Sequence, residues 1–186
     1  MRAGEIVIAV EAQLRRDDNG SGRTVYKREW SIGVGETRID IAAINGRLVG
    51  CEIKSARDNF GRLPSQVPLY SAVLDSAVLV VEGDAAAARA EAQLPSWWGI
   101  WCAIETPDGA RLKTVRDGAL NPAPEPLAIA QLLWRDEAYA VVERRGLGRC
   151  LRNATRWRLW DTLAAEMPLE TLQREVREAI TARRGW

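Results

Sequence analysis

The segment R-I-D-I-A-A-I-N-G-R-L-V-G-C-E-I-K-S, residues 38–55, decides the expected fold of this chain. Its alternating pattern predicts two short β-strands joined at Asn45-Gly46, a dipeptide that favours a tight hairpin turn. Asp40 lies on the first strand, and Glu52 and Lys54 lie on the second. Successive strand residues point to opposite faces, so Glu52 and Lys54 share a face.

The hydrophobic pattern of the hairpin indicates its register. A strict two-residue turn would mix polar and apolar side chains on one face. One additional loop residue makes one face wholly apolar, with the pairs Ile39–Ile53, Ile41–Cys51 and Ala43–Val49. The other face then carries Asp40 opposite Glu52, beside Ala42 and Gly50, which are small enough to leave room for a substrate. We therefore expect a three-residue loop or an equivalent bulge.

The two acids and the lysine are a chemically useful set. Only three of the 26 basic residues in the chain are lysines, so a lysine two residues after a glutamate stands out. Its amine can be shifted toward neutrality by its surroundings, whereas a guanidinium stays charged. Two carboxylates can hold Mg²⁺ or Mn²⁺, and a nearby amine can orient or deprotonate an attacking water. This combination indicates phosphodiester hydrolysis.

Composition excludes several other mechanisms. The chain of 186 residues has no histidine, which rules out Ser-His-Asp triads and histidine-dependent phosphodiesterases. It contains no phosphate-binding or dinucleotide-binding glycine motif, and its three cysteines form no C-x-x-C pair. The apolar stretch 6–10 is too short for a signal peptide or a membrane span, so we expect a cytoplasmic protein without membrane contact.

The rest of the chain predicts an α/β fold. The expected elements are an opening helix over 3–16, a strand over 23–33, the hairpin strands 37–44 and 47–55, a helix from Ser65 as N-cap to Leu74, a strand over 76–81, a helix over 84–94, and strands over 98–105 and 111–116. The proline-rich segment 121–126 marks a boundary. Helices are expected over 127–144, 151–166 and 169–183. This order predicts a core over residues 1–118 and a C-terminal helical extension over 119–186.

Asp40, the triplet Glu52-Ile53-Lys54 and the spacing of Gln66 and Tyr70 resemble the PD-(D/E)XK nuclease superfamily, with the Q-x-x-x-Y motif of its RecB-type branch. The resemblance covers about residues 1–82 and implies a restriction-endonuclease-like fold, a central mixed β-sheet flanked by helices. The chain departs from the pattern at Ile39, where a proline is common, and lacks the upstream histidine of many RecB-type nucleases.

By this resemblance, Asp40, Glu52 and the backbone carbonyl of Ile53 would ligate the metal, and Lys54 would position or activate water. An acid on the opening helix often contributes in such proteins, with Glu11 the best candidate and Glu5 the second. Gln66 and Tyr70 would contact DNA or steady the site. Ser55, directly after the lysine, either touches phosphate or only ends the strand.

A block of arginines in the C-terminal half gives a second candidate DNA contact. Six of them lie within fifteen residues that contain no acid, and we expect Arg149, Arg152 and Arg156 to track the phosphate backbone. Trp157 or Trp160 would stack on bases or pack underneath.

The sequence therefore predicts a Mg²⁺- or Mn²⁺-dependent deoxyribonuclease that acts on DNA in repair, restriction or mobile-element defence. The alternative is a catalytically inactive module that keeps the nuclease fold for nucleic-acid binding or assembly. The surplus of tryptophans is compatible with a homodimer.

Overall fold

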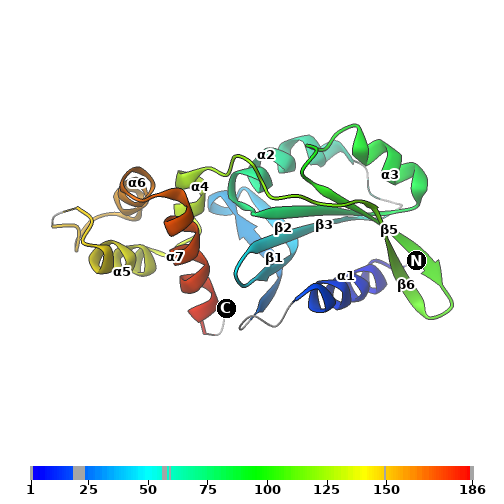
Figure 1. Ribbon diagram of the computed structural model, residues 1–186, viewed down its shortest axis with the longest axis horizontal. Helices are drawn as coiled ribbons and strands as arrows, with labels where there is room; N and C mark the ends of the chain where they lie inside the picture. Colours follow the sequence, from blue (N-terminus) through cyan, green and yellow to red (C-terminus); the bar gives the residue numbers. More distant parts are fainter. Residues whose placement is uncertain (1, 19–23, 56–57, 59, 149, 185–186) are drawn as a thin grey trace.

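The computed structural model describes residues 2–18, 24–55, 58, 60–148 and 150–184, and its centre is one mixed six-stranded sheet (Figure 1). The strands lie in chain order, namely β1 (Val25–Ile32), β2 (Thr37–Ile44), β3 (Leu48–Lys54), β4 (Ser76–Glu82), β5 (Gly99–Thr106) and β6 (Gly109–Arg116). The first three strands and the last two are antiparallel, whereas β3, β4 and β5 are parallel to one another. The predicted α/β class with a central mixed sheet is thereby confirmed.

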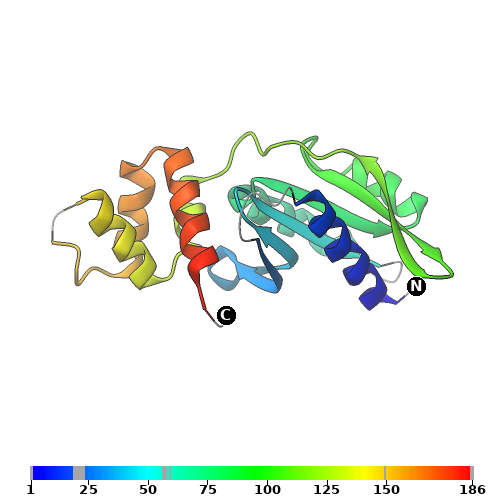
Figure 2. The same ribbon diagram turned by 60° about the horizontal axis from the view of Figure 1, so that its bottom comes forward.

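Helices cover both faces of the sheet. Figures 1 and 2 show α1 (Ala3–Asp17) on one face, and α2 (Leu63–Val73) and α3 (Asp84–Glu91) on the other. The parallel strands require crossover connections, which α2 and α3 supply. The helix, three-stranded meander, helix and strand expected from the sequence follow one another in that order.

The hairpin has the register that its hydrophobic pattern predicts. The paired residues are Ile41–Cys51, Ala42–Gly50, Ala43–Val49 and Ile44–Leu48, which leaves a three-residue loop over 45–47. Beyond Cys51 the Asp40 carboxylate accepts a hydrogen bond from the N–H of Ile53 at 2.7 Å. At this point of the β2–β3 pair the acceptor is the side chain of Asp40 and not a backbone carbonyl, so the carboxylate is bonded to the neighbouring strand.

The prediction of one wholly apolar hairpin face is wrong at Ile39. Ile41 packs toward α1, whereas Ile39 packs with the cluster on the opposite face. The cause lies on the neighbouring strand, where Glu29 has a φ of 50°, a left-handed value that non-glycine residues rarely adopt. Tyr26 packs toward α1 and Trp30 packs toward the other face, so the alternation of side chains in β1 changes at Glu29. The alternation in β2 changes at the adjacent Asp40, which places Ile39 on the face opposite to Ile41.

Helix α2 begins earlier than expected. Its N-cap is Arg62, so Ser65 lies inside the helix and donates its hydroxyl to the Arg62 carbonyl at 2.8 Å. The reason is Pro64, which occupies the first turn, where its missing N–H removes no helical hydrogen bond.

The expected helix over 127–144 is broken. The structure has α4 (Pro126–Ala130) and α5 (Arg135–Arg145), with Leu132 and Leu133 buried between them. Trp134 is the N-cap of α5, and its backbone N–H donates to the Glu137 carboxylate at 2.7 Å. This cap favours the start of a new helix at Arg135 over the continuation of α4. Helix α7 (Leu169–Ala182) matches the pattern, whereas α6 (Arg156–Glu166) begins five residues later than the expected 151, because Thr155 caps it by accepting the backbone N–H of Arg158. No helix within the described ranges has both the length and the apolar character needed to cross a membrane.

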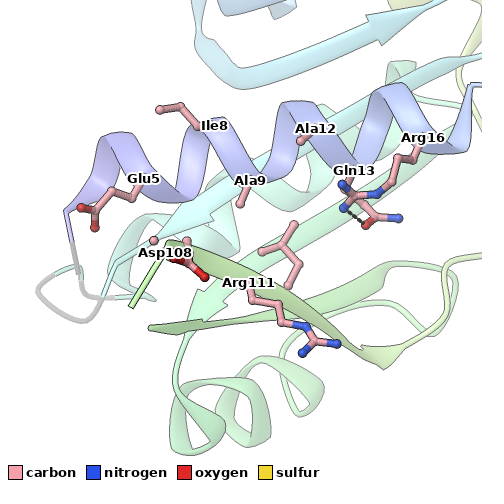
Figure 3. A pocket seen from close by; sticks show the side chains of 11 residues that line it. Glu5, Ile8, Ala9, Ala12, Gln13, Arg16, Asp108 and Arg111 are labelled. Atoms are coloured by element: carbon pink, nitrogen blue, oxygen red, sulfur yellow. Dashed lines mark hydrogen bonds between the residues drawn. The ribbon is translucent and has the colours of Figure 1, made fainter. Parts of the chain in front are cut away.

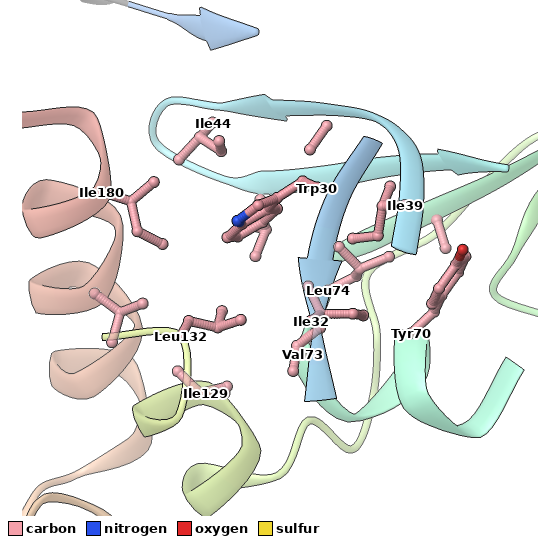
Figure 4. Close-up of a cluster of buried hydrophobic side chains, with 14 of the residues drawn as sticks. Trp30, Ile32, Ile39, Ile44, Tyr70, Val73, Leu74, Ile129, Leu132 and Ile180 are labelled. Atoms are coloured by element: carbon pink, nitrogen blue, oxygen red, sulfur yellow. The ribbon is translucent and has the colours of Figure 1, made fainter. Parts of the chain in front are cut away.

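The C-terminal helices extend the core of the sheet. Figure 4 shows Ile129, Leu132 and Ile180 around Trp30 and Ile44, all in one buried cluster. This cluster runs across the expected division between 1–118 and 119–186, which stays a prediction. Burial of apolar surface along the join stabilises the docking of the helices against the sheet.

Asp75, just before β4, anchors this docking through hydrogen bonds. Its carboxylate accepts a hydrogen bond from the backbone N–H of Leu48 at 2.6 Å. From α7 it accepts hydrogen bonds from the side chains of Gln173 at 2.9 Å and Arg177 at 2.8 Å. One buried side chain therefore joins the β2–β3 hairpin to the last helix.

Asp75→Ala is expected to lower the free energy of unfolding by about 2–4 kcal/mol, because three donors lose their acceptor in a buried place. Chemical denaturation of the full chain measures the change. The matched control is Asp161→Ala on the exposed side of α6, for which we expect a change within about 0.5 kcal/mol. Equal stability of the two variants would contradict the anchoring role.

Candidate active site

A cavity of about 690 Å³ opens where β1, β2 and β3 meet α2. Both sequence-predicted acids line it, together with Gln66 from α2. Its other charged residues are Glu29, Glu36, Arg38 and Arg62. The hairpin and the following helix thus bring Asp40 and Glu52 to one place, as the register requires.

Glu52, which lines the cavity, forms a buried ion pair with Lys54, which is not part of the lining. Their exposed fractions are 3% and 4%, and Lys54 Nζ lies 2.5 Å from Glu52 Oε1. The ammonium also donates to Gln66 Oε1 at 3.0 Å. The sequence predicted an accessible acidic face, and the structure instead covers this part of it with α2.

Two side chains of α2 hold Glu52 in position. Gln66 Nε2 donates to Glu52 Oε1 at 2.9 Å, and the Tyr70 hydroxyl lies 2.6 Å from Glu52 Oε2. The same hydroxyl is within hydrogen-bonding distance of the Arg38 carbonyl, and its ring stacks on Trp98. Burial and the charge of Glu52 raise the pKa of Tyr70, so the phenol stays protonated. Of the two roles predicted for Gln66 and Tyr70, these contacts support steadying the site.

Asp40 is held less tightly than Glu52. Burial, together with the nearby charge of Glu52, raises the pKa of Asp40 to about 6, although the N–H of Ile53 favours the ionised form. Its second oxygen, Oδ1, has no hydrogen-bond partner among the described residues. A carboxylate whose pKa is raised by a second carboxylate beside it is the arrangement that a divalent cation relieves.

The donor set around the cavity fits a hard cation with oxygen ligands. Asp40 offers one free oxygen, and Glu52 receives three donors although a carboxylate has about four acceptor sites. Within the described part of the chain, no group of three or more His, Cys, Asp or Glu side chains is placed to hold a metal. Remaining ligands would come from backbone carbonyls, water or substrate oxygens, as is usual for Mg²⁺.

The acids of the opening helix lie elsewhere. Glu11 forms an ion pair with Arg28 at 2.6 Å and is not part of the cavity lining. Glu5 lines a different cavity of about 590 Å³ between α1 and the β5–β6 turn, whose lining also includes Asp108 and Arg111 (Figure 3). The structure therefore does not join either acid to Asp40 and Glu52.

The remaining predicted residues have separate positions. Ile53 meets Asp40 through its N–H, and the ligand role of its carbonyl stays a prediction. Ser55 donates its N–H and its hydroxyl to Asp58 at 2.9 and 2.8 Å, just past the end of β3. Arg152 and Arg156 lie on the helical extension, and Arg149 falls outside the described residues.

Sequence reasoning did not single out the four other charged residues of the cavity, Glu29, Glu36, Arg38 and Arg62. Arg38 lies two residues before Asp40 and so shared its predicted strand face, and Arg62 lies four residues before Gln66 on one side of α2. Glu29 could be found only by pairing β1 with β2, and it contacts Arg38 at 3.1 Å.

These features define the class of the molecule, a mixed α/β protein with a buried acid–lysine pair beside a second carboxylate at a cavity. The chain belongs to the bacteriophage P4 protein cII family, whose model matches residues 6–185. No curated protein matches it in sequence. A solved structure with a match is SfsA from Pyrococcus furiosus in complex with Ca²⁺, with 17% identity over 59% of each chain and a TM-score of 0.33. So low a score carries no argument, and the match spans less than two thirds of SfsA.

The raised pKa of Asp40 predicts an unusual dependence of stability on pH. Between its ordinary value of 3.8 and about 6, the folded protein binds a proton that the unfolded chain has released. The free energy of unfolding should therefore fall as pH rises through this window, without added metal. Asp40→Asn should remove the fall and stabilise the protein at pH 7.5 by about 1–3 kcal/mol.

Denaturation from pH 4 to pH 8 in a chelating buffer measures this difference. Asp161→Asn serves as the control, since this carboxylate is exposed on α6, which lies apart from β2 and β3 (Figure 1), and the variant should keep the profile of the wild type. Parallel profiles for the wild type and Asp40→Asn would show that the pKa of Asp40 is not raised.

Proposed function

We propose that this protein is a Mg²⁺- or Mn²⁺-dependent deoxyribonuclease that hydrolyses phosphodiester bonds in DNA. The observation that carries the proposal is the meeting of Asp40 and Glu52 at one cavity, with the Lys54 ammonium 2.5 Å from Glu52. Carboxylates and an amine in this arrangement suit hydrolysis of a phosphate diester, which needs charge neutralisation and an oriented water.

The residues have distinct roles in this proposal. Asp40 and Glu52 would hold the cation, which when bound supplies positive charge at the phosphate and lowers the pKa of water. Lys54 has three N–H donors, of which Glu52 and Gln66 take two, and the third would hold the attacking water. Gln66 and Tyr70 keep the Glu52 carboxylate in place.

The arginines of the cavity support a phosphate substrate. Arg38 and Arg62 line the same cavity as Asp40 and Glu52, so two guanidiniums and two carboxylates share its wall. A guanidinium binds phosphate through paired N–H donors, which would fix the DNA backbone beside the acids.

The alternative is a non-catalytic nucleic-acid-binding or assembly module. One observation favours it, namely that three donors already contact Glu52 and that Lys54 is buried in the same network. A pair with so many partners also has a purely structural use, joining β3 to α2. Metal-dependent cleavage separates the two functions.

Purified protein should cleave DNA only when Mg²⁺ or Mn²⁺ is present, and Asp40→Asn should reduce the rate at least about 100-fold, because a ligand of the cation is lost. Linear duplex, circular duplex and single-stranded DNA are each incubated and resolved on gels. Asp40 is the informative position, since removing Glu52 or Lys54 alone leaves a buried charge without its partner and destabilises the fold.

Asp161→Asn is the matched control and should cleave like the wild type. A second readout is thermal unfolding, in which Mn²⁺ should raise the melting temperature of the wild type at pH 7.5 but not that of Asp40→Asn. Cleavage by Asp40→Asn at the wild-type rate would remove the proposed site, and DNA binding without any cleavage would favour the module.

A further inference from the structure

Among its described residues, the helical extension exposes two tryptophan rings. Trp134 is 55% exposed and Trp157 is 50% exposed, whereas Trp160 on the same helix as Trp157 is 3% exposed. Trp160 donates its indole N–H to the Leu133 carbonyl at 3.1 Å and belongs to the core. Of the two aromatic residues that the sequence offered for stacking on bases, only Trp157 is therefore available.

Trp157 is held in place from within the protein. Its ring meets that of Trp160 edge-on at a centroid distance of 5.1 Å. The Arg156 guanidinium lies 5.0 Å from the centroid of Trp157 and 5.3 Å from that of Trp160. A ring fixed by an edge contact and a cation–π contact loses little conformational entropy when a ligand stacks on it.

The described arginines close to Trp157 in the sequence are not neutralised by ion pairs. Among the described residues no carboxylate forms an ion pair with Arg152, Arg156 or Arg158. By contrast, Arg144 and Arg145 both form an ion pair with Glu175, so these two guanidiniums share one carboxylate inside the fold. The structure thus divides the arginine block of the sequence into a structural part and a part with available charge.

We infer that Trp157 with Arg152, Arg156 and Arg158, here called the arginine–tryptophan patch, binds single-stranded DNA. The ring would stack on an unpaired base, and the guanidiniums would contact the flanking phosphates. The inference deepens the proposed function and rests on it for the choice of DNA, but the binding itself does not use Asp40 or Glu52.

Single strands fit the patch better than the other occupants. In a duplex the faces of the bases are stacked on one another, so an exposed ring finds no base to cover. A second copy of the chain in a two-fold contact would bring the three arginines against the same three arginines, which like-charge repulsion disfavours. Single-stranded DNA offers phosphates that can pair with the guanidiniums and unpaired bases that can stack on the Trp157 ring.

The test measures binding of a fluorescent oligothymidylate of about 12 nucleotides, a length within the usual span of such sites. Asp40→Asn protein is used in a chelating buffer, so that no strand is cut. Adding Trp157→Ala should weaken binding by about 5- to 100-fold, and Trp157→Phe should retain most of it. Arg152→Ala and Arg156→Ala should each lower the dependence of log Kd on log salt concentration by about 0.7.

The matched control is Trp134→Ala. This ring is equally exposed and also lies beside an arginine, but Arg183 pairs with Glu137 at 2.6 Å and its charge is compensated. Binding by Trp134→Ala should equal that of the parent, and circular dichroism confirms that each variant is folded.

Three results would overturn the inference. These are unchanged binding by folded Trp157→Ala protein, equal binding of a duplex of the same length, and a change from dimer to monomer on Trp157→Ala in light scattering. The nuclease proposal fails separately, because binding that depends on Trp157 without metal-dependent cleavage by the wild type keeps the patch and removes the catalytic function.

Discussion

The rest of the site depends on the buried ion pair between Glu52 and Lys54. Both side chains come from one strand, so their proximity follows from the two-residue period, but their burial comes from α2. Gln66 contacts both partners, and Tyr70 adds a hydroxyl at the second oxygen of Glu52. A buried charge pair is stable only when its remaining donors and acceptors are satisfied, and α2 satisfies them. The helix that covers the pair therefore also orients it.

A second constraint is the change of face at Glu29 and Asp40. The left-handed φ of Glu29 interrupts the alternation of β1, and the adjacent part of β2 follows. Asp40 faces the cavity with Glu52, as the hairpin register predicts, and its Oδ2 accepts a hydrogen bond from the next strand, whereas Ile39 changes face. Residues in sparsely populated backbone conformations are often found at functional sites, and here the strained residue lines the cavity.

Local pattern and turn chemistry were sufficient for much of the fold. The Asn45-Gly46 turn and the alternation of the hairpin predicted its pairing, and the spacing of apolar residues predicted α1 and α7. The pattern of apolar residues failed as a predictor where contacts with other elements of the fold decided the local structure. Helix 127–144 is interrupted because Leu132 and Leu133 turn into the core, and Ile39 changes face because of a residue on another strand.

By itself, the sequence determined the register that places Asp40 near Glu52 and the spacing that brings Gln66 and Tyr70 to one side of a helix, since both depend on neighbours along the chain. Only the tertiary structure decided which acids share the cavity, placing Glu29 there and Glu11 with Arg28. It alone paired Arg144 and Arg145 with Glu175, and buried Trp160 while leaving Trp157 exposed. The physical reason is that burial and charge compensation depend on contacts between residues far apart in the chain, which periodicity does not encode.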